Sequence, residues 1–341
     1  MSFTRMAFTR SLIGSAAFAV AATVANAADM PVKAPAPVPL VQQQVSGYLE
    51  VYGGWASTNF RHTVCAVGGP CFQDPFDFDG WVLGGAGRAN AWIGSAMSVQ
   101  LDVQGEGTSY KNNYPFFGGE HISTHSYLIG GHANWRNAQT GLLGVFAGAG
   151  DAGGGFGQSL SVRHVVAGGE GQLYWNALTL YVQGGYDTVA GRPASDHLNA
   201  HAWFVRGTGR YFVLPNTMLE GTVLYANGEI KYDNGFVPAS GPTNGFETWL
   251  WEAKLEHRFT ATPFALFAKY RGSETKFDPI QFGSIDELKV TDHRVFVGLK
   301  LFMGQDTLRS NDRNGATLDI IDPLSIQSGP LMIGGTQALR P

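Results

Sequence analysis

Two Asp-His pairs and two histidines that stand four positions apart are the residues of this sequence that could do acid–base chemistry. The pairs are Asp196-His197 and Asp292-His293, and the spaced histidines are His121 and His125. A hydrolase needs a nucleophile, a histidine and an orienting carboxylate within hydrogen-bond reach. On a strand, adjacent side chains point to opposite faces, and residues four apart are separated by about 13 Å. Neither arrangement therefore forms a dyad or a two-histidine metal site.

No GxSxG or HExxH motif accompanies these histidines. We therefore expect that the chain is not an enzyme and that it binds no metal ion and no cofactor. The net charge of −4 gives no basic footprint for nucleic acid.

Charged residues recur at every second position, most clearly in FETWLWEAKLEHRF, residues 246–259. On a helix these charges would fall on both sides, and no clean polar face would form. A strand separates the two kinds of side chain. One face carries Trp249, Trp251, Leu255 and Phe259, and the other carries Glu252, Lys254, Glu256 and Arg258. The first face suits lipid and the second suits water.

The N-terminal region predicts export. Residues 1–27 combine Arg5 and Arg10 with an apolar run and the small-residue ending Ala25-Asn26-Ala27, a pattern typical of a secretory signal peptide. Residues 28–45 contain four prolines and predict an extended periplasmic linker. No later stretch of about 18 apolar residues could form a spanning helix. A membrane would therefore have to be crossed by strands.

Twelve segments show the alternating pattern, and short and long connections between them alternate. The segments are 46–57, 81–92, 97–107, 125–135, 141–150, 162–175, 178–188, 200–213, 218–230, 246–259, 264–273 and 291–302. The long connections are 59–77, 110–121, 151–161, 189–199, 232–245 and 276–288. Six further aromatic residues near segment ends would form interfacial girdles, namely Trp55, Trp81, Trp135, Trp175, Trp203 and Tyr211.

A soluble sandwich is the alternative fold, but its connections need not sort into a short and a long set. A transmembrane barrel sorts them in this way. The pattern predicts an all-β, antiparallel, up-and-down transmembrane β-barrel of about twelve strands over residues 46–303. Its short turns and both termini would be periplasmic, and its longer loops extracellular.

Two cysteines, Cys65 and Cys71, stand six positions apart. In an oxidising compartment they predict a disulfide that closes a small loop.

The mature start ADMPVKAPAPVP, followed by SGYLEVYGGWAS, resembles the small outer-membrane barrels of alphaproteobacteria that are often called porin-like or surface-antigen barrels. The specific likeness covers about residues 20–58. It implies the outer membrane of a Gram-negative bacterium and no catalytic residue. Barrels of this family commonly end at an aromatic residue that the insertion machinery reads, and Phe302 is the candidate here. Residues 304–341 follow and are predicted to form a periplasmic C-terminal tail.

The charged residues on the inward parity are the predicted pore lining. They are Glu50, Arg88, Asp102, Glu106, Glu170, Arg206, Arg210, Glu220, Glu252, Lys254, Glu256, Arg258, Lys269, Arg271, Arg294 and Lys300. Acids dominate the first half of the wall and bases the second, so facing walls would create a transverse field across the lumen.

The expected function is a narrow passive channel for small hydrophilic solutes. The alternative is that these charges pair and fill the lumen, because twelve strands enclose little space. The protein would then be an occluded structural or adhesive barrel that acts through its extracellular loops. The expected partners are outer-membrane lipid, the barrel-insertion machinery through the last strand and a small hydrophilic solute. No oligomeric state can be read from the sequence.

Overall fold

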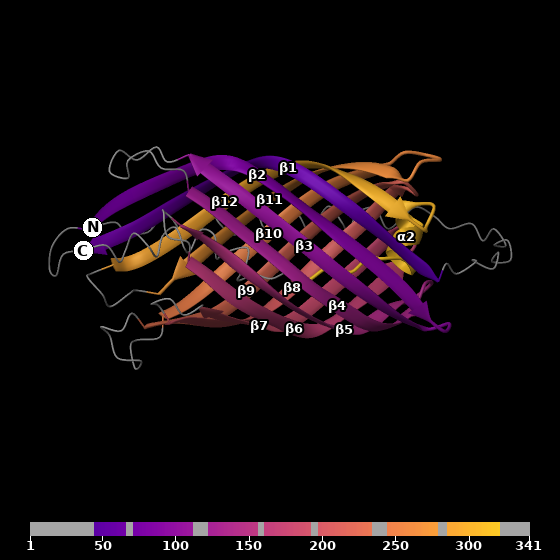
Figure 1. Cartoon of the computed structure of the whole chain (residues 1–341), viewed down its shortest axis with the longest axis horizontal. Coiled ribbons are helices and arrows are strands. Elements are labelled where there is room, and N and C mark those ends of the chain that lie inside the picture. Colours follow the sequence, from indigo (N-terminus) through magenta and orange to yellow (C-terminus); the bar gives the residue numbers. More distant parts are fainter. Residues whose placement is uncertain are drawn as a thin grey trace, which may run out of the picture. The chain divides into compact units, whose positions relative to one another are not determined.

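Twelve antiparallel strands close on themselves and form a barrel (Figure 1). This computed structural model describes residues 44–65, 71–111, 122–155, 160–191, 197–233, 244–278 and 285–320. Strand β1 (Val45–Cys65) pairs with β12 (Ile285–Met303), and this pairing closes the ring. The other strands are β2 (Cys71–Ile93), β3 (Met97–Lys111), β4 (Ile122–Asn137), β5 (Gly141–Gly155), β6 (Leu160–Trp175), β7 (Leu178–Gly191), β8 (His197–Leu214), β9 (Thr217–Asp233), β10 (Asn244–Arg258) and β11 (Phe264–Phe277).

The predicted fold class is confirmed. Closure pairs the backbone groups of every strand on both sides, which a bilayer demands of a spanning sheet. The predicted signal peptide, residues 1–27, and nearly all of the predicted linker lie outside the described residues. Among the helices that the structure describes, none is long and apolar enough to cross a membrane.

The strands run further than the sequence alternation predicts. The ladder between β1 and β2 continues to Cys65 and Cys71, across most of the predicted loop 59–77. The predicted loops 151–161, 189–199 and 276–288 are shortened in the same way. Crossing the hydrocarbon takes about 9–11 residues of a strand. Beyond that depth the ladder needs no apolar alternation, so the sequence pattern ends before the strands do.

The register places Cys65 directly opposite Cys71. Their side chains lie outside the part of the chain that the structure describes, so the disulfide stays a prediction.

Tight turns join the strands at the other end of the barrel, which we call the short-turn end. The two residues Asn176 and Ala177 connect β6 to β7, and Asn176 has a φ of 51°. Asparagine tolerates this left-handed conformation better than most residues. Gly94, with a φ of 70°, turns the chain between β2 and β3.

The outer face of the barrel is apolar and carries aromatic residues near both ends. Trp81 and Trp175 are exposed, and so are the aliphatic residues Leu83, Leu101 and Val297 on the same outer face. The six aromatic residues predicted for the girdles all point outward. A continuous apolar surface of this kind requires lipid or a partner to cover it.

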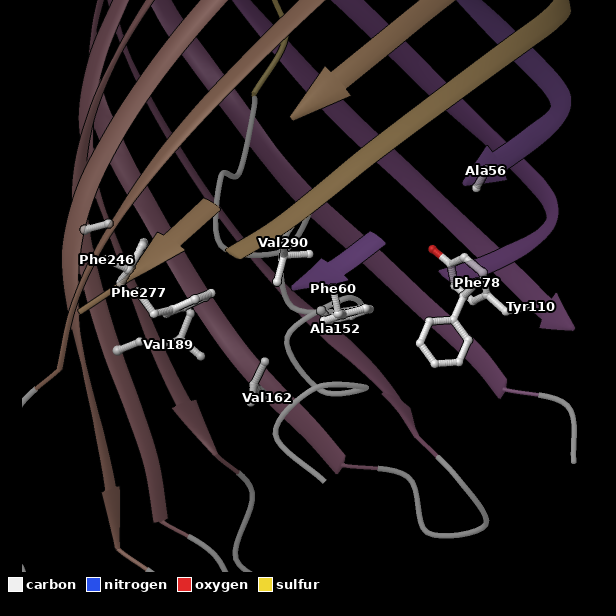
Figure 2. Packing of buried hydrophobic residues seen from close by; sticks show 12 residues of the cluster. Ala56, Phe60, Phe78, Tyr110, Ala152, Val162, Val189, Phe246, Phe277 and Val290 are labelled. Atoms are coloured by element: carbon white, nitrogen blue, oxygen red, sulfur yellow. The ribbon is translucent and has the colours of Figure 1, made fainter. Parts of the chain in front are cut away.

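The barrel interior also contains an apolar cluster at the ends of the strands opposite to the short turns (Figure 2). Phe60, Phe78, Tyr110, Phe246 and Phe277 are among its members. We call this cluster the apolar collar. The sequence analysis did not predict the apolar collar. Near these strand ends apolar and polar residues no longer alternate, so the sequence does not distinguish inward apolar residues from outward ones.

Replacing Val103 with arginine should destabilise the barrel. Val103 is 50% exposed on the outer face of β3, halfway between Met97, which pairs with Trp135, and Ser109, which pairs with Trp81. A charge at the bilayer midplane costs about 2–4 kcal/mol. Urea unfolding in vesicles, followed by heat-modifiable migration, should show this loss. Val103→Ala should cost much less, and equal losses would place Val103 outside the lipid.

Candidate functional site: the lumen and the luminal segment

All charged residues predicted to face inward lie on the interior face of the barrel. Their side chains are buried or nearly so, and even Lys269 and Glu252 have only 18% and 13% of their side-chain surface exposed. Strict alternation along each strand produces this sorting. A role in lining an open pore remains a prediction.

The interior charges are paired with one another. Glu106 of β3 accepts hydrogen bonds from Arg271, at 2.6 Å, and from Arg294. These arginines stand on β11 and β12, so the contacts bridge over β1 and β2 on the inside of the ring. Tyr52 donates a further hydrogen bond to Glu106 at 3.1 Å.

A second group of ion pairs lies closer to the short turns. The ammonium group of Lys300 lies 3.1 Å from Glu50 and 3.0 Å from Glu256. Glu220 is shared by Lys254, at 2.8 Å, and Arg210, at 2.7 Å. The predicted field between an acidic and a basic wall stays a prediction, and pairs such as Glu50 with Lys300 join acids of the first strands to bases of the last. An unpaired charge in a narrow interior would lose its hydration without compensation, so acids and bases interleave.

His132 of β4 bridges two carboxylates and was missed by the sequence analysis. Its Nδ1 lies 2.8 Å from Glu170 and its Nε2 lies 3.0 Å from Asp102. The side chain is fully buried. The inward parity of position 132 was the available signal.

The chain continues after β12 back into the barrel. Residues 304–320, which we call the luminal segment, begin with a turn at Gly304 and the short helix α2 (Leu308–Asn314). Figure 1 shows α2 at one end of the barrel. The backbone N–H of Arg309 donates to Pro215 at 3.1 Å, which places α2 at the short-turn end. The predicted periplasmic tail is thus corrected over residues 304–320, and residues 321–341 lie outside the described residues.

Beyond α2 the luminal segment is extended and alternates like a strand. Ala316, Leu318 and Ile320 are at most 1% exposed, and each enters a different cluster of wall residues. Leu318 packs with Leu142 and Tyr181. Ile320 packs in a cluster that includes Leu128, Phe146, Val166, Phe204 and Leu250.

Glycine makes the space for Ile320. A Cβ at Gly130 would lie 2.3 Å from the Ile320 Cδ1 atom, and one at Gly148 would lie 3.2 Å from it. Apolar packing therefore fixes how far the luminal segment enters.

The polar side of the luminal segment is also bound. Asp319 accepts a hydrogen bond from Arg206 at 2.8 Å, and Thr317 accepts one from Arg210 at 2.7 Å. Burial alone would raise the pKa of the Asp319 carboxyl, but the positive charges of Arg206 and Arg88 outweigh it and hold that pKa well below its usual range. Asp319 therefore stays ionised and bound well into the acidic range.

Side chains of the wall also bind the backbone of the luminal segment. The Gln100 amide donates to the Leu318 carbonyl at 2.7 Å and accepts from the Leu318 N–H at 3.2 Å. Gln183 donates to the Asp319 carbonyl at 2.8 Å, and Gln104 to the Ile320 carbonyl at 3.1 Å. Arg136 donates to the Gly315 carbonyl at 2.7 Å.

The predicted pore lining left out the glutamines because it followed charge alone, and it left out Arg136 because the predicted segment 125–135 ends one residue earlier. The uncharged glutamines stand on the inward parity, and Ala316-Thr317-Leu318-Asp319-Ile320 repeats the alternation of the strands. That repeat indicated a segment with one side in apolar contacts and the other side in polar contacts.

Two cavities remain beside the luminal segment. The larger, of about 120 Å³, is lined by Asp319 and Ile320 together with charged residues of the wall that include Arg88, Glu106 and Arg271. The smaller, of about 60 Å³, lies between α2 and the wall and is lined by Asp312, Glu220 and Lys254, among others. Over the described residues, the luminal segment and the wall side chains thus occupy much of the interior, and these two spaces beside the segment are lined mainly by polar residues.

Comparison with known proteins assigns no family. No family model matches the chain, and no curated protein matches it. The resemblance of the N-terminal region to alphaproteobacterial barrels therefore stays a prediction.

Several solved structures of similar fold are outer-membrane proteins. An outer membrane channel of Pseudomonas putida F1, described as COG4313, is 14% identical over 81% of this chain and 100% of its own, with a TM-score of 0.46. A FadL homologue of Pseudomonas aeruginosa is 10% identical over 75% of this chain and 90% of its own, with a TM-score of 0.40. The Escherichia coli outer membrane protease OmpT is 11% identical over 76% and 97%, with a TM-score of 0.38.

These likenesses concern the barrel fold alone. The chain is an outer-membrane type β-barrel by its closed antiparallel topology and its apolar outer face, which its own residues show. Its function has to be argued from its interior.

Replacing Glu106 with glutamine should destabilise the folded barrel by about 1–3 kcal/mol. Arg271 and Arg294 would lose the carboxylate that compensates their buried charges. The loss of unfolding free energy stays below that of an ion pair fully excluded from water, because the adjoining cavity admits water. Urea unfolding measures it. The rim pair Glu247–Lys276 is roughly half exposed, so Glu247→Gln should cost at most about 1 kcal/mol. Equal losses of unfolding free energy for the two variants would contradict a structural role for the ion pairs of Glu106 with Arg271 and Arg294.

Proposed function

We propose that the protein is an outer-membrane channel for small hydrophilic solutes and that its own luminal segment holds it closed. The observation that carries this proposal is the position of residues 304–320 inside the barrel, where both the apolar and the polar side chains of the segment have partners on the wall. The predicted signal peptide and the apolar outer face support the location in the outer membrane.

The polar lining favours a lumen that opens. Buried ion pairs contribute little net stability, and apolar residues of similar volume would often fill a permanently closed interior at lower cost. This interior instead carries ion pairs at every level between the short-turn end and the apolar collar. Such a lining tolerates water when the luminal segment leaves.

The luminal segment is held by contacts that can be exchanged. Burial of Leu318 and Ile320 contributes about 1.5–3 kcal/mol for each side chain. The hydrogen bonds from Gln100, Gln104 and Gln183 add about 1 kcal/mol each. Ordering the extended chain opposes these gains. Contacts that each contribute only about 1–3 kcal/mol suit a segment that is mostly seated and sometimes released.

The alternative is an occluded barrel with a structural or adhesive role. The ion pairs between strands that are not neighbours, such as Arg294 with Glu106, favour it because they occupy interior space that a solute would need. The two proposals differ in one property: whether release of the luminal segment opens a path for ions.

Replacing Leu318 with aspartate should open the channel. The variant loses apolar burial and places a charge beside Leu142 and Tyr181, which together disfavour the seated state by at least about 3 kcal/mol, or roughly 100-fold. In planar bilayers the wild-type protein should be closed for most of the time. Leu318→Asp should show steady, salt-dependent conductance.

Trypsin provides an independent readout of release. Arg313 lies in α2 and contacts the backbone of Asn176, so cleavage there should be slow in the wild type and fast in Leu318→Asp. The matched control is Asp306→Asn, since Asp306 is exposed and precedes α2. A folded Leu318→Asp protein that trypsin cleaves rapidly but that passes no current would reject the channel in favour of the occluded barrel.

A further inference from the structure

We infer that the Arg206 site, which holds Asp319, is also a binding site for a small carboxylate solute, and that binding of this solute releases the luminal segment. The inference rests on the proposed closed channel and names the class of solute that opens it.

Arg206 is a prepared carboxylate site that Asp319 uses only in part. One Nη of the guanidinium donates to Gln183 at 2.9 Å, and the group lies 5.3 Å from the centre of the Tyr181 ring. These contacts fix its orientation. Asp319 accepts from the other Nη through one oxygen. Among the described residues, neither the Arg206 Nε nor the second oxygen of Asp319 has a hydrogen-bond partner. That oxygen lies 3.9 Å from an Nη of Arg210.

Asp319 is prevented from turning by the attachments of its backbone. Its carbonyl accepts from Gln183, and the neighbouring Leu318 is bound through both backbone groups by Gln100. A free carboxylate has no such attachment and can offer both oxygens to the guanidinium. Bidentate pairing of this kind is the stronger arrangement. The site therefore offers a free carboxylate a hydrogen bond, from the Arg206 Nε, that Asp319 does not make.

The charge of the larger cavity also requires an anion when Asp319 leaves. Its lining contains four basic residues and four acidic residues. The bases are Arg88, Lys269, Arg271 and Arg294, and the acids are Glu50, Glu106, Glu252 and Asp319. Without Asp319 the cavity is lined by four basic and three acidic residues. Arg206 also loses the carboxylate with which it is paired. A buried positive excess is costly, so an anion that replaces Asp319 stabilises the released state.

The space and the access fit a small solute. One water molecule needs about 10–15 Å³ of cavity volume. A cavity of about 120 Å³ therefore holds on the order of ten waters or one small organic acid. Asp319 and Ile320 form part of its wall, whereas Arg206 lies behind Asp319 and does not line it, so a solute in the cavity reaches Arg206 as Asp319 leaves. The planar, five-donor guanidinium selects a planar carboxylate over a spherical anion, and a cation would be repelled.

Acetate is the probe for this inference, and acetamide is its neutral isostere. The open probability of the full-length wild-type protein would be measured in planar bilayers during an acetate titration, with chloride replaced so that ionic strength stays constant. We expect a saturable increase, because a ligand at ten times its dissociation constant for the open state multiplies the ratio of open to closed by about elevenfold. Acetamide and chloride should produce no increase.

Variants assign the effect to the site. Arg206→Lys keeps the charge but loses the fork of donors, so its acetate response should shift to several-fold higher concentrations or disappear. Asp319→Asn should open without acetate. Asp306→Asn, the same substitution at an exposed position of the segment, should behave as the wild type in both respects. Acetate-dependent cleavage of the wild type at Arg313 repeats the test without any variant.

Failure of the inference and failure of the channel are distinguishable. If Leu318→Asp conducts but acetate neither opens the wild type nor accelerates cleavage at Arg313, the carboxylate site is rejected and the channel stands. An increase that chloride reproduces, or that Arg206→Lys leaves unchanged, also rejects the site. If acetate accelerates cleavage but no variant or solute produces current, the binding site stands and the channel is rejected.

Discussion

The requirement that every ionised group inside the barrel has a partner shapes the rest of the interior. Glu106 with Arg271 and Arg294, and Lys300 with Glu256, join strands that are not neighbours in the sheet. The same requirement reaches the luminal segment, because Arg206 finds its carboxylate on Asp319 rather than on the wall. The wall is therefore electrostatically incomplete without the residues that follow it in the chain.

Apolar packing supplies the position that ion pairs alone would leave loose. Charged side chains are long and can adjust by several ångströms, whereas Leu318 and Ile320 fit clusters whose shape is fixed by the strands. The glycines at 130 and 148 leave room for one side chain and no more. These apolar contacts set how far the luminal segment enters the barrel. The charge of Arg206 determines which class of solute can compete with the segment.

The fold could be predicted from the sequence because lipid imposes a simple rule on each strand. The rule gave the number of strands, their approximate cores and the inward direction of Glu252, Lys254 and Arg258. It could not give the strand ends, because the ladder beyond the lipid follows hydrogen bonding rather than hydrophobicity. It also could not show the pairing of the charges. Parity along one strand says nothing of which strands face each other across a lumen.

The site was harder to predict for a related reason. Gln100, Gln104 and Gln183 gain their role only from a segment far away in the sequence, and each would be an ordinary polar residue in a water-filled barrel. Arg206 was predicted as an inward residue, but its partner was assigned to a tail outside the barrel. Long-range contacts of this kind are visible only when the barrel is closed.

The direct covalent link between β12 and the luminal segment sets an order of assembly. Gly304 turns the chain immediately after the strand that closes the ring against β1. The luminal segment takes its partners from several strands at once, through Gln100 of β3, Gln183 of β7 and Arg206 of β8. Its full set of contacts therefore requires that the wall has already folded, and we expect the residues after β12 to seat last and to close the barrel from within.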